Sequence, residues 1–180
     1  VDPHLTSGRV LGLLGRTGSG KTTLTRLLLR FYDPLEGAVF VDGVDLRAVK
    51  IQDLRRAVGM VTQDVQLFHA SVRDNLGFFA AGISNKRIKE TLYELGLGNW
   101  FESLPEGLDT VLAPNGADLS AGEAQLLAFA RVFLKDPQFV ILDEASSRLD
   151  PQTEAHIEKA IDHLLGKRNH RFRLWRTDDD

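Results

Sequence analysis

Short apolar runs alternate with segments of helical periodicity along this chain. The runs at residues 9–14, 58–62 and 139–142 are almost continuously apolar, which is typical of strands buried on both faces of a parallel sheet. Between them, apolar residues recur every three or four positions, as in helices that bury one face. The pattern predicts helices from residue 22 to Asp33-Pro34, over 51–57, 71–79, 84–95 and 120–135, and from Asp150-Pro151 to about 165.

A small hairpin interrupts this alternation, because apolar residues 38–41 and Val44 flank the turn sequence Asp42-Gly43. Strands that alternate with helices predict an α/β fold, in which a mostly parallel sheet carries helices on both faces. At 180 residues with 43% hydrophobic residues, the chain is long enough for about one domain with its own core.

The net charge and the cysteine content argue against several classes of function. A net charge of -3 argues against general nucleic-acid binding, and the lack of cysteine excludes disulfides, thiol catalysis and Cys-ligated zinc. No apolar stretch approaches the roughly 20 residues of a membrane-spanning helix. The first residues do not form a signal peptide, and the absence of an initial Met suggests a piece of a longer chain.

The strongest motif is glycine-rich and lies between the first predicted strand and the first predicted helix. Residues 15–22 fit G-x-x-x-x-G-K-[ST], and a strand followed by a helix is the context that this phosphate-binding motif requires. Its glycines let backbone N–H groups turn toward a phosphate, and the helix N-terminus adds partial positive charge. Lys21 is expected to reach the β- and γ-phosphates, and the Thr22 hydroxyl to bind Mg²⁺.

Two adjacent acids, Asp143 and Glu144, follow the strand predicted at 139–142. Groups at the carboxyl ends of the strands face the ligand crevice of an open α/β sheet. Asp143 is expected to hold Mg²⁺, and Glu144 to act as the general base that polarises the attacking water. The alternative is that both acids simply end a strand in solvent.

A serine and a glycine open the helix predicted at 120–135. Ser120 and Glu123 fit a capping box, and taken alone this is the better interpretation of the pair. Capping does not explain Gly122, which lowers helix propensity in the first turn but allows a ligand to approach the backbone. His156 and His163 share one face of the last predicted helix, which we interpret as solvated.

Taken together, these motifs resemble the nucleotide-binding domain of ATP-binding cassette (ABC) transporters. Residues 119–123 look like the family's LSGGQ signature, with Ala121 and Glu123 as departures. Residues 61–64 resemble the Q-loop, and residues 146–150 resemble the D-loop. Residues 31–34, 53–55 and 66–68 look most like the exporter branch.

The resemblance implies a P-loop NTPase fold and an exporter-type ATPase that uses ATP and Mg²⁺. Gln63 and Glu144 would be catalytic, and Thr22, Gln63 and Asp143 would hold the metal. The residues implied for ATP binding are Gly15, Arg16, Thr17, Gly18, Ser19, Gly20, Lys21, Thr22 and Thr23.

The resemblance also implies a dimer, in which two domains pack head to tail and each ATP lies between one phosphate loop and the partner's signature. Ser147 and Asp150 of the D-loop would cross this interface. The signature residues that would contact the partner's ATP are Leu119, Ser120, Ala121, Gly122 and Glu123.

The implied partners are a second nucleotide-binding domain, identical or different, and a transmembrane domain fused upstream, at the cytoplasmic face of the cell membrane. Nucleic acid is not expected as a partner. Two other functions stay open: a nucleotide-binding half that does not hydrolyse, and an ABC-type ATPase that works without a membrane. The resemblance implies one domain over 1–168, with a core at about 8–65 and 136–168 and an inserted helical signature subdomain at about 66–135.

Two family features have no counterpart in the sequence. No aromatic residue precedes the first strand to stack on adenine, and His170 follows the last helix too soon to be the switch histidine. Residues 169–180 read as an atypical tail, because Arg171, Arg173 and Arg176 interrupt its apolar residues. We therefore expect that this segment is not the buried last strand, and that the 180-residue chain alone hydrolyses ATP weakly.

Overall fold

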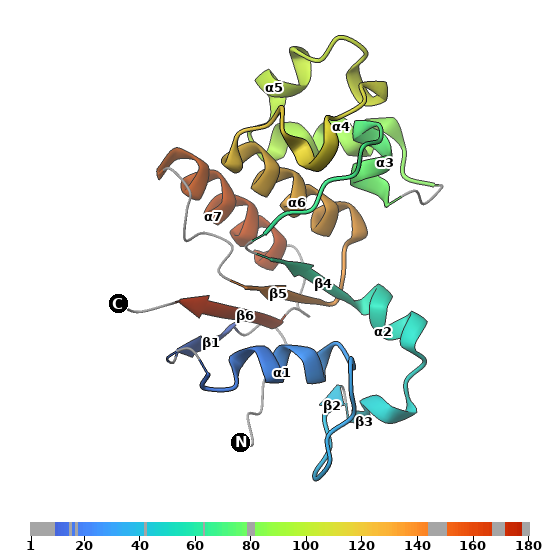
Figure 1. The fold of residues 1–180 in the computed structure, drawn as a ribbon, viewed down its shortest axis with the longest axis vertical. Helices are drawn as coiled ribbons and strands as arrows, with labels where there is room; N and C mark the ends of the chain where they lie inside the picture. Colours follow the sequence, from blue (N-terminus) through green and yellow to red (C-terminus); the bar gives the residue numbers. More distant parts are fainter. Residues whose placement is uncertain are drawn as a thin grey trace.

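Within the part of the chain that the structure describes, a parallel sheet of four strands lies at the centre of the fold (Figure 1). Its strands are β1 (Val10–Leu14), β4 (Val58–Val61), β5 (Phe139–Leu142) and β6 (Phe172–Thr177), in the spatial order β1-β6-β5-β4. All three neighbouring pairs are parallel. The computed structural model describes residues 10–14, 16, 18–41, 43–62, 64–78, 82–143, 151–166 and 172–177.

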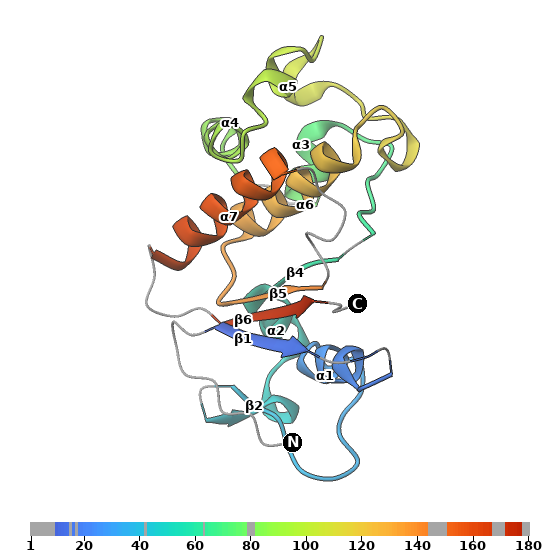
Figure 2. The same ribbon diagram turned by 90° about the vertical axis from the view of Figure 1, so that its left-hand side faces the viewer.

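Helices cover both faces of this sheet, as predicted from the alternation of strands and helices. Helix α1 (Lys21–Leu28) lies on one face, and α6 (Ala121–Lys135) and α7 (Pro151–Gly166) lie on the other (Figures 1 and 2). The ammonium of Lys135 donates to the Val58 carbonyl at 2.8 Å, and so links the end of α6 to the start of β4. Partial burial lowers the pKa of Lys135 because it penalises the charged form.

A short hairpin lies beyond the α1 face of the sheet. Its strands β2 (Phe40–Val41) and β3 (Val44–Asp45) pair antiparallel around the predicted turn. The 3-10 turn η1 (Leu46–Ala48) and helix α2 (Ile51–Ala57) follow and lead into β4.

A group of short helices covers the far side of α6 (Figure 1). The helices predicted at 71–79 and 84–95 correspond to α3 (Val72–Gly77) and α4 (Asn85–Glu94), which begin after the N-cap residues Ser71 and Ser84. Helix α5 (Gly98–Glu102) and the 3-10 turns η2 (Gly107–Asp109) and η3 (Pro114–Gly116) were not predicted, because glycine and proline obscure a periodicity in segments this short.

The buried apolar residues form one large cluster and one small one. The large cluster joins α3, α4 and α6 to β4 and β5, and its fully buried members include Leu92 and Phe129. The small cluster joins Leu46 and Leu54 to Val58 and Ile141 on the opposite side of the sheet. Helix α6 therefore connects the sheet to the helical group through a continuous core.

Removing the Leu92 side chain beyond its Cβ should destabilise the chain by about 2–5 kcal/mol, because Leu92 is 0% exposed and its loss leaves a cavity. The same change at Leu35, which is fully exposed, should alter the free energy of unfolding by less than about 0.5 kcal/mol. Urea unfolding of Leu92→Ala and Leu35→Ala measures both values. Equal midpoints for the two variants would contradict the assigned core.

Helix α1 is shorter than its periodicity predicted. It ends at Leu28, and Arg30 adopts a left-handed conformation with φ 51° that terminates the helix before Asp33. Phe31 consequently lies past the helix and is 66% exposed, so it is not part of the buried helix face. The Arg30 guanidinium donates to Asp33 at 2.9 Å and to the Val49 carbonyl at 2.8 Å, which stabilises this earlier end.

The expectation that the last strand is missing is wrong. Residues Phe172–Thr177 form β6, which lies between β1 and β5 and pairs with both. The crossover through α7 brings the chain back beside β5, and a strand at this position satisfies backbone groups on both neighbours whatever its side chains are. The arginines made the segment look unsuitable, and the backbone requirement outweighs them.

The interpretation of His156 as part of a solvated face is also wrong. His156 is half-buried and packs against Gly96, where an added Cβ would lie 2.9 Å from the imidazole Cδ2. Gly96 has φ +77°, so a glycine is needed there both for the turn after α4 and for the close approach of α7. The side chain of His163 lies outside the described part of the chain.

Candidate functional site

The glycine-rich loop connects β1 to α1, as the motif requires. Gly18 and Gly20 have φ +85° and +92°, in the left-handed region that favours glycine. The Ser19 N–H donates to the Arg16 carbonyl at 3.0 Å and closes a tight turn. Gly20 is the N-cap of α1, and no side chain caps this helix. The loop therefore presents the start of α1 as an anion site, with Gly15 and Thr17 outside the described residues.

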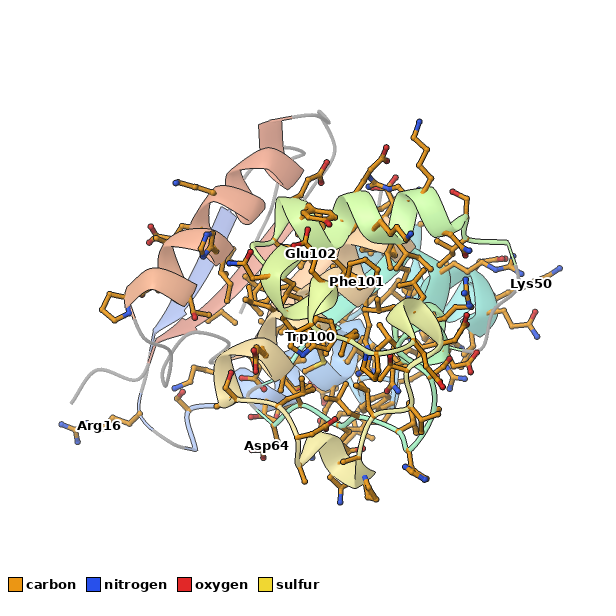
Figure 3. All side chains as sticks on the ribbon, turned by 90° about the horizontal axis from the view of Figure 1, so that it is seen from above. Arg16, Lys50, Asp64, Trp100, Phe101 and Glu102 are labelled. Carbon is orange, nitrogen blue, oxygen red and sulfur yellow. The ribbon has the colours of Figure 1, made fainter. Side chains whose placement is uncertain are left out.

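Space over the loop is open. Among the described residues, no atom lies within 4 Å of a Cβ placed at Gly18 or Gly20, so backbone conformation rather than crowding requires the glycines. Figure 3 shows the Arg16 side chain projecting away from the ribbon, on the opposite side of the view from Lys50. The loop thus has room for a ligand group against its backbone.

Lys21 lies beneath this open space. Only 9% of its surface is exposed, and its Nζ is 3.5 Å from the Arg16 carbonyl oxygen. The ammonium is therefore directed back into the loop rather than into bulk solvent. Thr22 and Thr23 follow in the first turn of α1 and are exposed.

Asp143 follows β5 and is half-buried. Its N–H donates to the Val61 carbonyl at 2.9 Å, so it extends the pairing of β4 and β5 by one step. The strands are parallel, and their carboxyl ends meet at one edge of the sheet. Asp143 and the loop after β1 therefore share this edge, while Gln63, Glu144, Ser147 and Asp150 lie outside the described residues.

The start of α6 is a capping box, as the sequence predicted. The Glu123 N–H donates to the Ser120 hydroxyl at 3.2 Å, and the Glu123 carboxylate accepts from the Ser120 N–H at 2.8 Å. The Ser120 hydroxyl also donates to the Glu123 carboxylate at 2.8 Å. Ser120 and Ala121 are exposed, Gly122 is half-buried, and Leu119 packs against the large core cluster.

Three buried polar residues near the site were not singled out from the sequence. Gln125 and Arg131 of α6 are 5% and 9% exposed, and Asn75 of α3 is 1% exposed. Burial lowers the pKa of Arg131 to about 10, because the charged guanidinium loses solvation. A glutamine and an arginine within an otherwise apolar helix face were the signal that could have identified two of them.

A comparison with protein families matches residues 1–147 to the family described as ABC transporter. The chain belongs to the ABC transporter family. The predicted family is thereby confirmed. Among the described residues, no helix combines the length and hydropathy needed to cross a membrane.

Relatives within the ABC family are ATP-binding proteins and exporters. The chain is 43% identical over 157 residues to the heterocyst differentiation ATP-binding protein HepA of Nostoc sp., across 87% of the chain and 26% of HepA. It is 39% identical over 165 residues to an ATP-dependent lipid A-core flippase of Syntrophus aciditrophicus, across 92% of the chain and 28% of the flippase. The chain thus spans about a quarter of the length of these relatives.

A solved structure of an ABC exporter also supports the assignment to the exporter branch. The structure of a bacterial Atm1-family ABC exporter with ATP bound superposes with a TM-score of 0.85 at 34% identity, covering 94% of this chain and 30% of the exporter chain. The chain therefore has the P-loop NTPase fold of an exporter-type ABC nucleotide-binding domain.

Proposed function

We propose that this chain binds ATP and hydrolyses it to drive transport across a membrane. The observation that carries the proposal is the loop after β1, where Gly18 and Gly20 adopt left-handed conformations and Lys21 is buried beneath them. This loop shares the sheet edge with Asp143. ABC transporter ATP-binding domains are generally ATPases, and these features supply phosphate binding and an acidic group at one place.

In this proposal, the glycine-rich loop and the first turn of α1 bind the phosphates of ATP. Backbone N–H groups of the loop donate to phosphate oxygens, and the ammonium of Lys21 binds the β- and γ-phosphates. The residues proposed to contact ATP are Gly15, Arg16, Thr17, Gly18, Ser19, Gly20, Lys21, Thr22 and Thr23.

The donor set at the sheet edge fits Mg²⁺, which prefers hydroxyl and carboxylate oxygens over nitrogen or sulfur. Thr22 and Asp143 offer such oxygens, and Gln63 adds an amide oxygen. When bound, Mg²⁺ supplies positive charge against the β- and γ-phosphate oxygens. Gln63 orients the attacking water, and Glu144 accepts its proton as general base.

The transport cycle requires a second nucleotide-binding domain, which is either identical or different. The signature residues 119–123 of one domain contact the ATP of the other, and Ser147 and Asp150 cross the interface. ATP binding closes the dimer and hydrolysis reopens it, which moves a transmembrane domain joined to each half. We place the chain at the cytoplasmic face of the membrane on this basis.

Glu144→Gln is the experiment that tests hydrolysis. The exchange removes the general base and keeps the size of the side chain, so hydrolysis should fall by roughly 10²–10⁴-fold while ATP binding is retained. Phosphate release and labelled-ATP titration measure the two quantities in the longest form that the gene encodes.

Unchanged turnover in Glu144→Gln would remove Glu144 from catalysis. A wild-type dimer that retains intact ATP for hours would instead favour the non-hydrolysing function. The 180-residue chain alone is expected to turn over slowly, since it lacks an adenine-stacking aromatic and a switch histidine.

A further inference from the structure

The segment between β4 and α3 contains the Gln63 position, and its described residues 62 and 64–70 form no helix or strand. Main-chain groups in such a segment need partners from elsewhere in the fold. Two buried polar side chains of α6 provide them, one at each end of the segment. The same helix begins with the signature at Ser120.

Arg131 binds the C-terminal part of this segment, at Gln66. Its Nη1 donates to the Gln66 carbonyl at 2.7 Å, and its Nε donates to the Asn75 carbonyl at 2.8 Å. The guanidinium also lies 4.8 Å from the ring centre of Phe78 and 5.9 Å from that of Phe68. Among the described carboxylates, none forms an ion pair with Arg131, so main-chain carbonyls and aromatic faces are its partners.

Asn75 extends this contact along the segment. Its Oδ1 accepts from the Phe68 N–H at 2.8 Å and from Arg131 Nη2 at 3.1 Å. Its Nδ2 donates to the Phe68 carbonyl at 2.9 Å and to the Ala70 carbonyl at 3.2 Å. Residues 66–70 are thus hydrogen-bonded to the Asn75 amide of α3 and the Arg131 guanidinium of α6.

Gln125 binds the N-terminal end of the segment, at Thr62. Its Nε2 lies 3.4 Å from the Thr62 carbonyl oxygen, one residue before Gln63. Gln125 is 5% exposed, and burying an amide is unfavourable unless hydrogen bonds compensate it. The Thr62 carbonyl offers the buried amide such a hydrogen bond, so the Gln125 side chain is best explained by what it binds.

We propose that Gln125 and Arg131 are positioning residues, which fix the segment around Gln63 to the helix that begins with the signature. This inference rests on the proposed function. Helix α6 would contact the partner's ATP at its first turn and bind this segment five and eleven residues after Ser120. A rigid helix therefore couples contact with the partner's ATP to the position of the segment around Gln63. Gln63 would then be held for Mg²⁺ and water binding only when α6 is correctly placed.

The test compares Gln125→Met with wild type in the longest form that the gene encodes. Methionine keeps the length of the side chain and removes the N–H donor. We expect kcat to fall about tenfold and the Mg²⁺ concentration for half-maximal rate to rise severalfold, because a 1 Å misplacement is costly to catalysis. Affinity for ATP should stay within about twofold, because the phosphate loop is untouched.

Thr91→Val is the matched control. Thr91 is 0% exposed, and its hydroxyl has no hydrogen-bond partner among the described residues, so this buried polar group supports no segment near the site. Its kcat and Mg²⁺ dependence should equal those of wild type. Arg131→Lys is the second variant, which keeps the charge, loses the fork of donors, and should lower kcat in the same way.

Unchanged kcat and Mg²⁺ dependence in Gln125→Met would overturn the proposal. So would equal losses in Gln125→Met and Thr91→Val, because they would show a general packing effect. Absence of hydrolysis in wild type would instead count against the proposed function. In that case the Mg²⁺ dependence of ATP binding decides the inference, and equal dependence in wild type and Gln125→Met overturns it.

Discussion

Lys21→Ala should reduce the affinity for ATP by at least about a hundredfold, because charge-assisted contacts to phosphate are among the strongest hydrogen bonds. Lys21 is 9% exposed, and its ammonium lies 3.5 Å from the Arg16 carbonyl, inside the loop. Its charge therefore already lies at the proposed phosphate site, and we expect its side chain to lose little freedom on binding. Titration of labelled ATP against both proteins measures the effect.

Lys50→Ala is the control for this experiment. Lys50 is exposed at the start of α2 and makes no side-chain cap, so its removal changes the net charge equally without touching the loop. Its affinity should match wild type. Equal affinities for Lys21→Ala and Lys50→Ala would refute the assignment of Lys21 to phosphate binding.

Ser120→Arg should abolish ATP-driven dimerisation and leave ATP binding to the single chain intact. The proposed target of Ser120 belongs to the partner, and an arginine at the exposed start of α6 would fill the space that the partner's phosphate needs. Loss of the capping box adds about 1 kcal/mol of destabilisation. Size-exclusion chromatography with ATP in a Glu144→Gln background reports the dimer.

Ser84→Arg is the control that distinguishes two effects of Ser120→Arg, the loss of a helix N-cap and the steric block of the dimer interface. Ser84 is also an exposed N-cap serine, and it accepts from the Arg87 N–H at 3.2 Å at the start of α4. Ser84→Arg should lose a similar amount of stability and still form the dimer. A normal dimer peak for Ser120→Arg would rule out contact of the signature with the partner's ATP.

Local signals predicted the parts of the fold that depend on neighbouring residues. Continuous apolar runs identified β1, β4 and β5, and the capping box of Ser120 and Glu123 identified the start of α6, since caps and periodicity act within one or two turns. The phosphate loop was predicted for the same reason, because its motif is contiguous. Helix α5 was missed because five residues carry too little periodicity.

Features that depend on distant residues could not be predicted in this way. Arg131 donates hydrogen bonds to Gln66 and Asn75, which lie more than fifty positions earlier in the chain. No spacing pattern in the sequence predicts contacts between residues this far apart. The position of β6 was likewise decided by two neighbouring strands rather than by its own arginines. Tertiary hydrogen bonding outweighed the local pattern in both cases.

The place of β6 has a consequence for the order in which the domain is completed during synthesis. Within the described sheet, β1 pairs only with β6, with Leu11 opposite Leu174, so the strand that precedes the glycine-rich loop must wait for a strand far later in the chain. Ribosomes add residues from the N-terminus, and such long-range pairing forms late. The helical group around α6 can fold earlier, and the strand before the glycine-rich loop acquires its pairing only after β6 has been made.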